Sequence, residues 1–109
     1  MLSKEKCEAC SSNARPLIDI EIEPLLEQLD GWSMKEIDGE KRIVKTFTFD
    51  NFRGALEFTK KVGEAAETEN HHPLIITEWG KTTVHWWTHK IGGLHRNDFI
   101  MAAKTDDLY

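Results

Sequence analysis

Apolar residues recur along the chain at two different spacings, which separate predicted helices from predicted strands. Between residues 18 and 29 they recur at helical spacing, and Gly31 ends the segment. Residues 52–68 carry a longer stripe at intervals of three and four, and Asp50 or Asn51 can cap its start by accepting a backbone N–H bond. The pattern therefore predicts one short and one long amphipathic helix.

Two hairpins are predicted from residues that favour extended backbone. The first turns at Asp38-Gly39, a dipeptide typical of tight hairpins because both residues can adopt positive φ. The second turns at Gly80-Lys81, between segments rich in β-branched and aromatic residues. The predicted strands span residues 32–37, 42–49, 74–79 and 82–88.

A last helix is expected to begin near residues 95–98 and to carry Phe99 and Ile100 inward. The order helix, hairpin, helix, hairpin, helix predicts an α+β domain: a four-stranded antiparallel sheet from two hairpins, with three helices on one face. We expect this single domain to span residues 18–109. Residues 1–17 are polar and are expected to form a flexible leader.

Composition and charge narrow the possible functions. The chain has 109 residues, of which 39% are hydrophobic, and a net charge of −5. It contains no basic run, so direct binding to nucleic acid is not expected. No apolar run approaches the roughly 20 residues that span a bilayer, and the N-terminus lacks the apolar stretch of a signal peptide. We therefore expect a cytoplasmic protein with no membrane association.

Cys7 and Cys10 form a Cys-x-x-Cys pair in the leader. A full zinc site needs about four ligands, and the sequence holds no second cysteine pair. A thioredoxin-type pair would follow a strand in a βαβ unit, which this pair does not. We expect no catalytic role for these cysteines, while a weak metal site or an oxidation-sensitive site stays open.

Histidines concentrate where the long helix meets the second hairpin. His72 lies eight residues before Gly80 and His89 nine residues after it, so the hairpin places both at its open end. Glu67 lies one helical turn before His71, where its carboxylate can accept a bond from an imidazole nitrogen. Such a bond fixes the histidine tautomer and favours protonation of the ring.

The same side chains allow a competing interpretation as the zinc centre of a metal-dependent hydrolase. Adjacent histidines in an extended chain point in opposite directions, however, which makes a shared metal awkward. His85 would share a strand face with His89. We expect His85 and His95 to be ordinary surface or structural residues.

The spacing of these residues resembles the signature of the pterin-4a-carbinolamine dehydratases. The matching residues are Glu67, His71, His72, Pro73, Trp79, His89 and Asp98. The resemblance covers about residues 18–105. It is greatest to the bacterial members that accompany phenylalanine hydroxylase.

The resemblance implies an enzyme, a hydro-lyase that converts 4a-hydroxytetrahydrobiopterin to quinonoid dihydrobiopterin and water. This reaction recycles the pterin cofactor of aromatic amino acid hydroxylases, and it implies no metal and no organic cofactor. Such a hydroxylase is a possible partner. The alternative is a non-catalytic regulatory or coactivator module on the same fold. A free strand edge and four tryptophans in a small chain also predict a homodimer or homotetramer.

The implied reaction needs an acid at the departing 4a-hydroxyl group and a base for the N5 proton, and histidine can serve as either near neutral pH. By resemblance, His71 and His89 are the acid/base candidates, in an order that the sequence leaves open. His72 completes the catalytic group and binds the pterin, while Glu67 orients a histidine.

Further contacts with the pterin are expected from residues around the histidines. Pro73 and Thr88 flank them and can reach the ring edge through backbone groups. Trp32 is either a wall of the pterin site or a core tryptophan. Asp98 lies in the first turn of the last helix, where we expect a structural, capping role.

Overall fold

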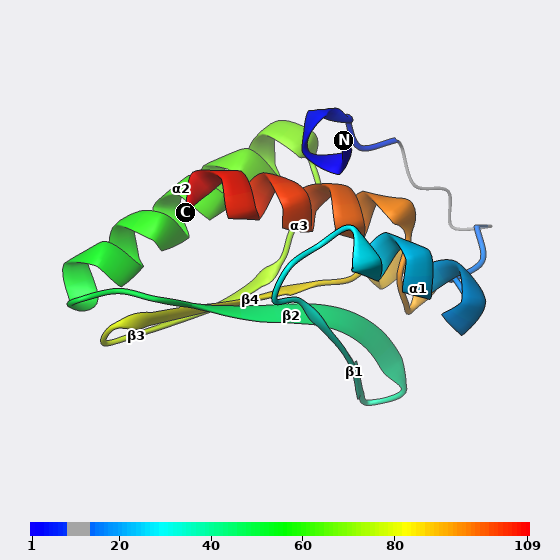
Figure 1. Ribbon diagram of the computed structural model, residues 1–109, viewed down its shortest axis with the longest axis horizontal. Coiled ribbons are helices and arrows are strands. Elements are labelled where there is room, and N and C mark those ends of the chain that lie inside the picture. Colours follow the sequence, from blue (N-terminus) through cyan, green and yellow to red (C-terminus); the bar gives the residue numbers. More distant parts are fainter. Residues whose placement is uncertain (9–13) are drawn as a thin grey trace.

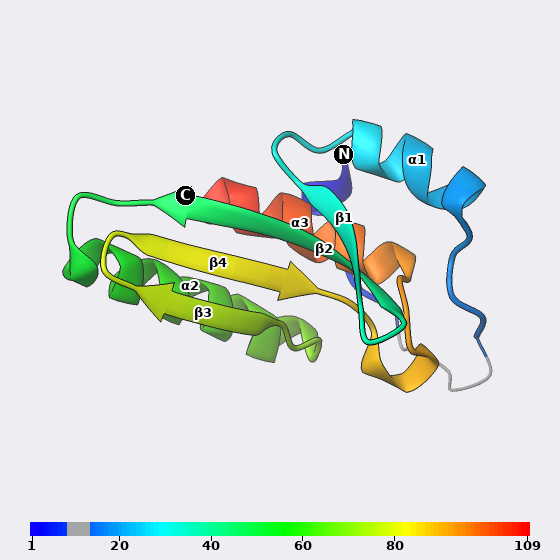
Figure 2. The ribbon, with the colours of Figure 1, turned by 90° about the horizontal axis from the view of Figure 1, so that it is seen from below.

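The computed structural model describes residues 1–8 and 14–109, and its centre is one antiparallel sheet with strand order β1-β2-β4-β3. All three α-helices lie on the same side of this sheet (Figure 1). Seen from below, the two hairpins join through their inner strands, β2 and β4 (Figure 2). The predicted α+β architecture is therefore confirmed.

The strands are β1 (Ser33–Ile37), β2 (Glu40–Thr48), β3 (Leu74–Glu78) and β4 (Lys81–Trp86). The helices are α1 (Asp19–Glu27), α2 (Phe52–Glu69) and α3 (Arg96–Leu108), with the 3-10 turns η1 (Leu2–Lys4) and η2 (His89–Ile91).

The hairpin turns follow from residues that tolerate positive φ. Asp38 and Gly39 have φ values of 54° and 79°, as the tight-turn prediction requires. In the second hairpin Glu78 pairs with Lys81, so the turn consists of Trp79 and Gly80, one residue earlier than predicted. Gly80 supplies the positive φ there, at 75°.

Local hydrogen bonds cap both ends of helix α2. The side chain of Asn51 accepts a bond from the Gly54 N–H at 2.8 Å, which caps the first turn. Asn70 adopts the left-handed conformation at the other end, with φ 53°, and the His71 N–H bonds to the Ala66 carbonyl at 3.1 Å. This turn leads the chain from the helix into the histidine pair and strand β3.

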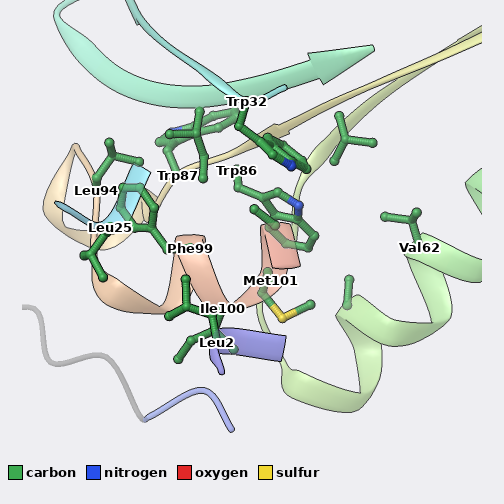
Figure 3. Packing of buried hydrophobic residues seen from close by; sticks show 14 of the residues in the cluster. Leu2, Leu25, Trp32, Val62, Trp86, Trp87, Leu94, Phe99, Ile100 and Met101 are labelled. Atoms are coloured by element: carbon green, nitrogen blue, oxygen red, sulfur yellow. The ribbon is translucent and has the colours of Figure 1, made fainter. Parts of the chain in front are cut away.

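The core lies between the sheet and the helices (Figure 3). Trp86 is its largest fully buried side chain, and the indole N–H donates to Thr105 Oγ1 at 3.1 Å. Trp32 is also buried, and its indole N–H donates to both carboxylate oxygens of Asp106 at 3.1 Å. These bonds satisfy polar atoms that burial would otherwise leave without a partner.

The first residues pack on the domain, which corrects the prediction of a flexible leader for residues 1–8. Leu2 is 3% exposed and lies beside Ile100 of α3 (Figure 3). Farther along the chain, the Leu17 N–H bonds to the Leu94 carbonyl at 2.8 Å. The polar composition concealed this packing because Leu2 is the one buried side chain among residues 1–8. Cys10 lies outside the described residues.

No helix in the described parts of the chain is long and apolar enough to cross a membrane.

Candidate functional site

A cavity of about 460 Å³ opens where α2 ends and α3 begins. Its walls come from four separate parts of the chain: the N-terminal residues, the end of α2, the segment after β4 and the start of α3. The lining residues are Cys7, Glu8, Glu69, Asn70, His71, His72, Thr88, His89, Lys90 and Asn97. The structure thus brings the three predicted catalytic histidines to one cavity.

His71 is held by a buried carboxylate. Its Nε2 lies 2.6 Å from Oδ1 of Asp98, whose side chain is 0% exposed. The other carboxylate oxygen of Asp98 accepts the Thr88 hydroxyl and the His95 backbone N–H, both at 2.9 Å. The imidazole also stacks on Trp86, with an interplanar angle of 10°. These contacts fix the ring and its tautomer, because a carboxylate can only accept and Nε2 must therefore carry a proton.

Asp98 therefore does more than the sequence suggested. The predicted capping role is present, since its carboxylate accepts the N–H of the N-cap residue His95. Its bond to His71 joins residues 27 positions apart, which no local pattern indicates. The one available signal was the fixed position of Asp98 in the family signature.

His72 and Glu67 form a second pair at the rim of the cavity. Their Nε2 and Oε1 atoms lie 2.6 Å apart, but the two side chains are 54% and 77% exposed. Glu67 therefore contacts a histidine, as predicted, and that histidine is His72. Solvent weakens a pair this exposed, so it holds its imidazole less firmly than Asp98 holds His71.

His89 reaches the cavity from a turn instead of a strand. Strand β4 ends at Trp86, and the Thr88 N–H bonds to the Gly93 carbonyl at 2.8 Å, which closes the η2 turn. The prediction that His89 extends the face of the strand is therefore wrong. Its exposed ring packs against Trp87, with ring centroids 4.3 Å apart.

Two predicted pterin contacts do not line this cavity. Trp32 lies in the core, bonded to Asp106 two helical turns from Asp98, so the structure favours its core interpretation. Pro73 lies between His72 and strand β3 and is also absent from the lining. Thr88 does line the cavity, and its hydroxyl is bonded to the Asp98 carboxylate.

The remaining histidines have structural positions. His85 is buried on the outer face of the sheet, where burial and then the Arg42 and Lys35 charges lower the pKa of its imidazole. His95 is the N-cap of α3, and its Nδ1 accepts the Asn97 N–H at 3.0 Å.

Sequence reasoning missed the part of the cavity formed by Cys7, Glu8, Glu69 and Asn97. Cys7 and Glu8 are about 90 positions from Asn97 in the sequence, so no spacing rule relates them. Burial, together with the nearby Glu69 carboxylate, raises the pKa of the Cys7 thiol to about 12. This thiol therefore stays protonated at neutral pH.

The zinc alternative receives no geometric support within residues 1–8 and 14–109. His71 and His72 turn their Nε2 atoms toward different carboxylates. No group of three or more histidine, cysteine, aspartate or glutamate side chains in these ranges could hold a metal ion.

The fold and the cavity define a small α+β domain with a histidine–carboxylate site suited to proton transfer. A family model described as pterin 4 alpha carbinolamine dehydratase matches residues 15–108. The chain therefore belongs to the pterin-4a-carbinolamine dehydratase family, which confirms the resemblance seen in the sequence.

Individual relatives agree with this assignment. A protein of Chlorobium luteolum is 53% identical over 108 residues, which cover 99% of this chain and 95% of that protein. A protein of Marinobacter nauticus is 54% identical over 108 residues, covering 99% and 97%. Both are provisionally named pterin-4-alpha-carbinolamine dehydratases, and this name denotes a hydro-lyase. A crystal structure from Brucella melitensis, described as a transcriptional coactivator/pterin dehydratase, has a TM-score of 0.76 and 30% identity, covering 86% of this chain and 98% of that one.

Proposed function

We propose that this chain dehydrates 4a-hydroxytetrahydrobiopterin to quinonoid dihydrobiopterin, with His71 and His89 as the acid/base pair. The observation that carries the proposal is the His71–Asp98 pair, because its histidine lines the same cavity as His89. Family membership supplies the substrate class.

The two histidines are suited to different halves of the reaction. The bond to Asp98 fixes the tautomer of His71 with Nδ1 as the acceptor nitrogen, so we assign His71 as the acceptor for the N5 proton. His89 is exposed and has no carboxylate partner among the described residues, so it can exchange protons with water and protonate the departing hydroxyl group. The C4a–O bond breaks, the N5–H proton moves to His71 and the C4a=N5 double bond forms. The released hydroxyl group leaves as water with the proton from His89.

The other polar groups at the rim have binding roles in this proposal. His72, held by Glu67, binds and orients the pterin. Thr88 helps indirectly, because its hydroxyl donates to the carboxylate that fixes His71.

The test is dehydration of chemically generated 4a-hydroxytetrahydropterin, followed by absorbance. His71→Ala and His89→Ala should each lower kcat by roughly 10²–10⁴-fold, the usual contribution of a positioned acid or base. His85→Gln is a matched control because His85 lies on the opposite face of the sheet. Turnover within twofold of wild type in both alanine variants would remove the assignment.

The proposal includes a cytoplasmic homodimer or homotetramer that serves an aromatic amino acid hydroxylase, as in phenylalanine hydroxylation. Strand β3 is at the edge of the sheet, and Leu74, Ile76 and Trp79 are exposed on or beside it. Such an edge can pair with a second copy. Light scattering at micromolar concentration should give an oligomer mass, and a monomer mass would contradict this part.

A coactivator role is the second candidate, favoured by the description of the Brucella melitensis structure. It predicts that a partner captured by the wild-type protein is still captured when His71, His72 and His89 are all alanine. Loss of capture in that variant would argue against a coactivator role that is independent of the histidine site.

A further inference from the structure

The N-terminal residues connect the two elements that carry the His71–Asp98 pair. We call residues 2–8 the N-terminal strap. Leu2 anchors its start in the core, and the Lys104 ammonium donates to the Ser3 carbonyl at 3.0 Å. Near its middle, the Arg96 guanidinium binds both carboxylate oxygens of Glu5, at 2.8 and 3.0 Å. The strap therefore follows α3 toward the cavity.

The end of the strap is held by one buried amide. The Asn97 side chain donates to the Glu8 carbonyl at 2.7 Å and accepts the Glu8 N–H at 2.9 Å. Asn97 is 2% exposed, so its amide would lose both partners if the strap moved away. Two bonds to one amide fix the position of Glu8 against the start of α3, which makes this docking specific. Asn97 directly precedes Asp98, so the strap ends beside the carboxylate that holds His71.

Cys7 ties the strap to the other wall of the cavity. Its backbone N–H donates to Glu69 Oε1 at 2.9 Å, and Glu69 is the last residue of α2. Its thiol lies 3.9 Å from the Asn97 carbonyl oxygen. Cys7 therefore lies between the end of α2 and the start of α3. The neutral thiol adds a weakly polar surface to this wall.

We propose that the strap is part of the pterin-binding site: Cys7 and Glu8 form a wall against which the substrate rests, and Asn97 is the positioning residue for that wall. This inference rests on the proposed function and extends it. The strap touches the carbonyl and side chain of Asn97 and the side chain of Glu69, and it makes no hydrogen bond to His71, His72 or His89 among the described residues. Its loss should therefore weaken substrate binding more than the proton transfers, and KM should rise more than kcat falls.

The first test separates binding from chemistry. Asn97→Ala and Glu8→Pro each remove part of the same contact, because proline has no N–H to donate to Asn97. Each should raise KM on the order of tenfold, with a smaller change in kcat. The double variant should be little worse than either single variant. Asn51→Ala is the matched control: it removes an amide that caps the far end of α2, so it lowers stability without changing KM.

The second test observes the strap without relying on turnover. In a Cys10→Ser background, a thiol reagent reports on Cys7 alone, and reaction should be slow because the thiol is protonated and half-buried. Saturating 7,8-dihydrobiopterin, a stable pterin, should slow labelling further. Asn97→Ala should accelerate labelling at least tenfold, and Asn51→Ala should not.

The contrary results separate failure of the strap inference from failure of the proposed function. Normal turnover with unchanged KM in both strap variants, or absence of pterin protection, would overturn the strap inference alone. Equal acceleration of labelling by Asn51→Ala and Asn97→Ala would also overturn it, because Cys7 would then react through global unfolding. A wild-type protein that neither turns over 4a-hydroxytetrahydropterin nor binds 7,8-dihydrobiopterin would remove the proposed function and the strap inference together.

Discussion

The sharpest prediction concerns the carboxylate that holds His71. Replacing Asp98 with asparagine keeps the size and most of the hydrogen-bonding capacity of the side chain, but it substitutes an amide NH₂ for one carboxylate oxygen. The oxygen bonded to the Thr88 hydroxyl and the His95 N–H must remain an acceptor, because both groups donate to it. The new NH₂ group must therefore face Nε2 of His71.

An NH₂ group in that position reverses the histidine tautomer. In the wild type Nε2 of His71 donates to Asp98 across 2.6 Å, which leaves Nδ1 as the acceptor nitrogen. In Asp98→Asn, Nε2 must accept instead, so Nδ1 carries the proton and can no longer take one from the substrate. We expect kcat to fall roughly 10²–10⁴-fold, as for removal of a general base.

The structural cost should be smaller than the catalytic cost. Only the bond to His71 changes, from a charge-assisted bond to a weaker neutral one, while the two other bonds to the side chain persist. The free energy of unfolding should therefore fall by about 1–3 kcal/mol. Urea unfolding monitored by tryptophan fluorescence measures the change in unfolding free energy, and steady-state dehydration measures the fall in kcat. Glu67→Gln is the comparison: its pair with His72 is exposed, so its effect on kcat should be at least tenfold smaller. A folded Asp98→Asn protein with kcat within twofold of wild type would refute the tautomer argument.

Two further predictions concern stability. Leu2→Ala should lower the free energy of unfolding by about 2–5 kcal/mol, because Leu2 is 3% exposed in the core, and urea unfolding with no measurable change would mean that residues 1–8 do not pack as described. Burial and the Arg42 charge lower the pKa of His85, so the unfolded chain binds a proton more readily than the folded one. The stability contributed by neutral His85 is therefore present above its ordinary pKa of about 6.5 and is lost as pH falls through the lower, folded-state pKa. His85→Gln should flatten the dependence of unfolding free energy on pH in this acidic range, and an unchanged slope would contradict the assignment.

Local signals allowed most of the fold to be predicted from the sequence. The Asp38-Gly39 turn and the Asn51 cap each depend on a few neighbouring residues, and the structure contains both. The position of His89 was harder to predict, because the end of β4 depends on the bond between Thr88 and Gly93 that closes the η2 turn. Composition gave no sign that the chain leaves the strand there.

The sequence allowed the histidines of the site to be predicted, but it did not indicate which residues hold them in place. Hairpin geometry brought His72 and His89 to one end of the molecule, as expected. The bond between His71 and Asp98 and the contact between Cys7 and Asn97 join residues 27 and 90 positions apart. Contacts at such separations produce no periodic pattern in the sequence. Trp32 was ambiguous for a different reason: from the sequence, an aromatic residue near a turn can contact a ligand or pack in the core.

The contact between Glu8 and Asn97 also bears on the order in which the molecule is assembled. It spans 89 positions, so the chain entropy lost in closing this loop precedes any stabilisation from the contact. During synthesis the first residues emerge long before α3 and have no surface to dock on until it appears. The hairpins and α2 can pair beforehand, because their contacts are more local. We therefore expect the cavity to be completed late in folding, and a pterin present during refolding should act mainly on this last step.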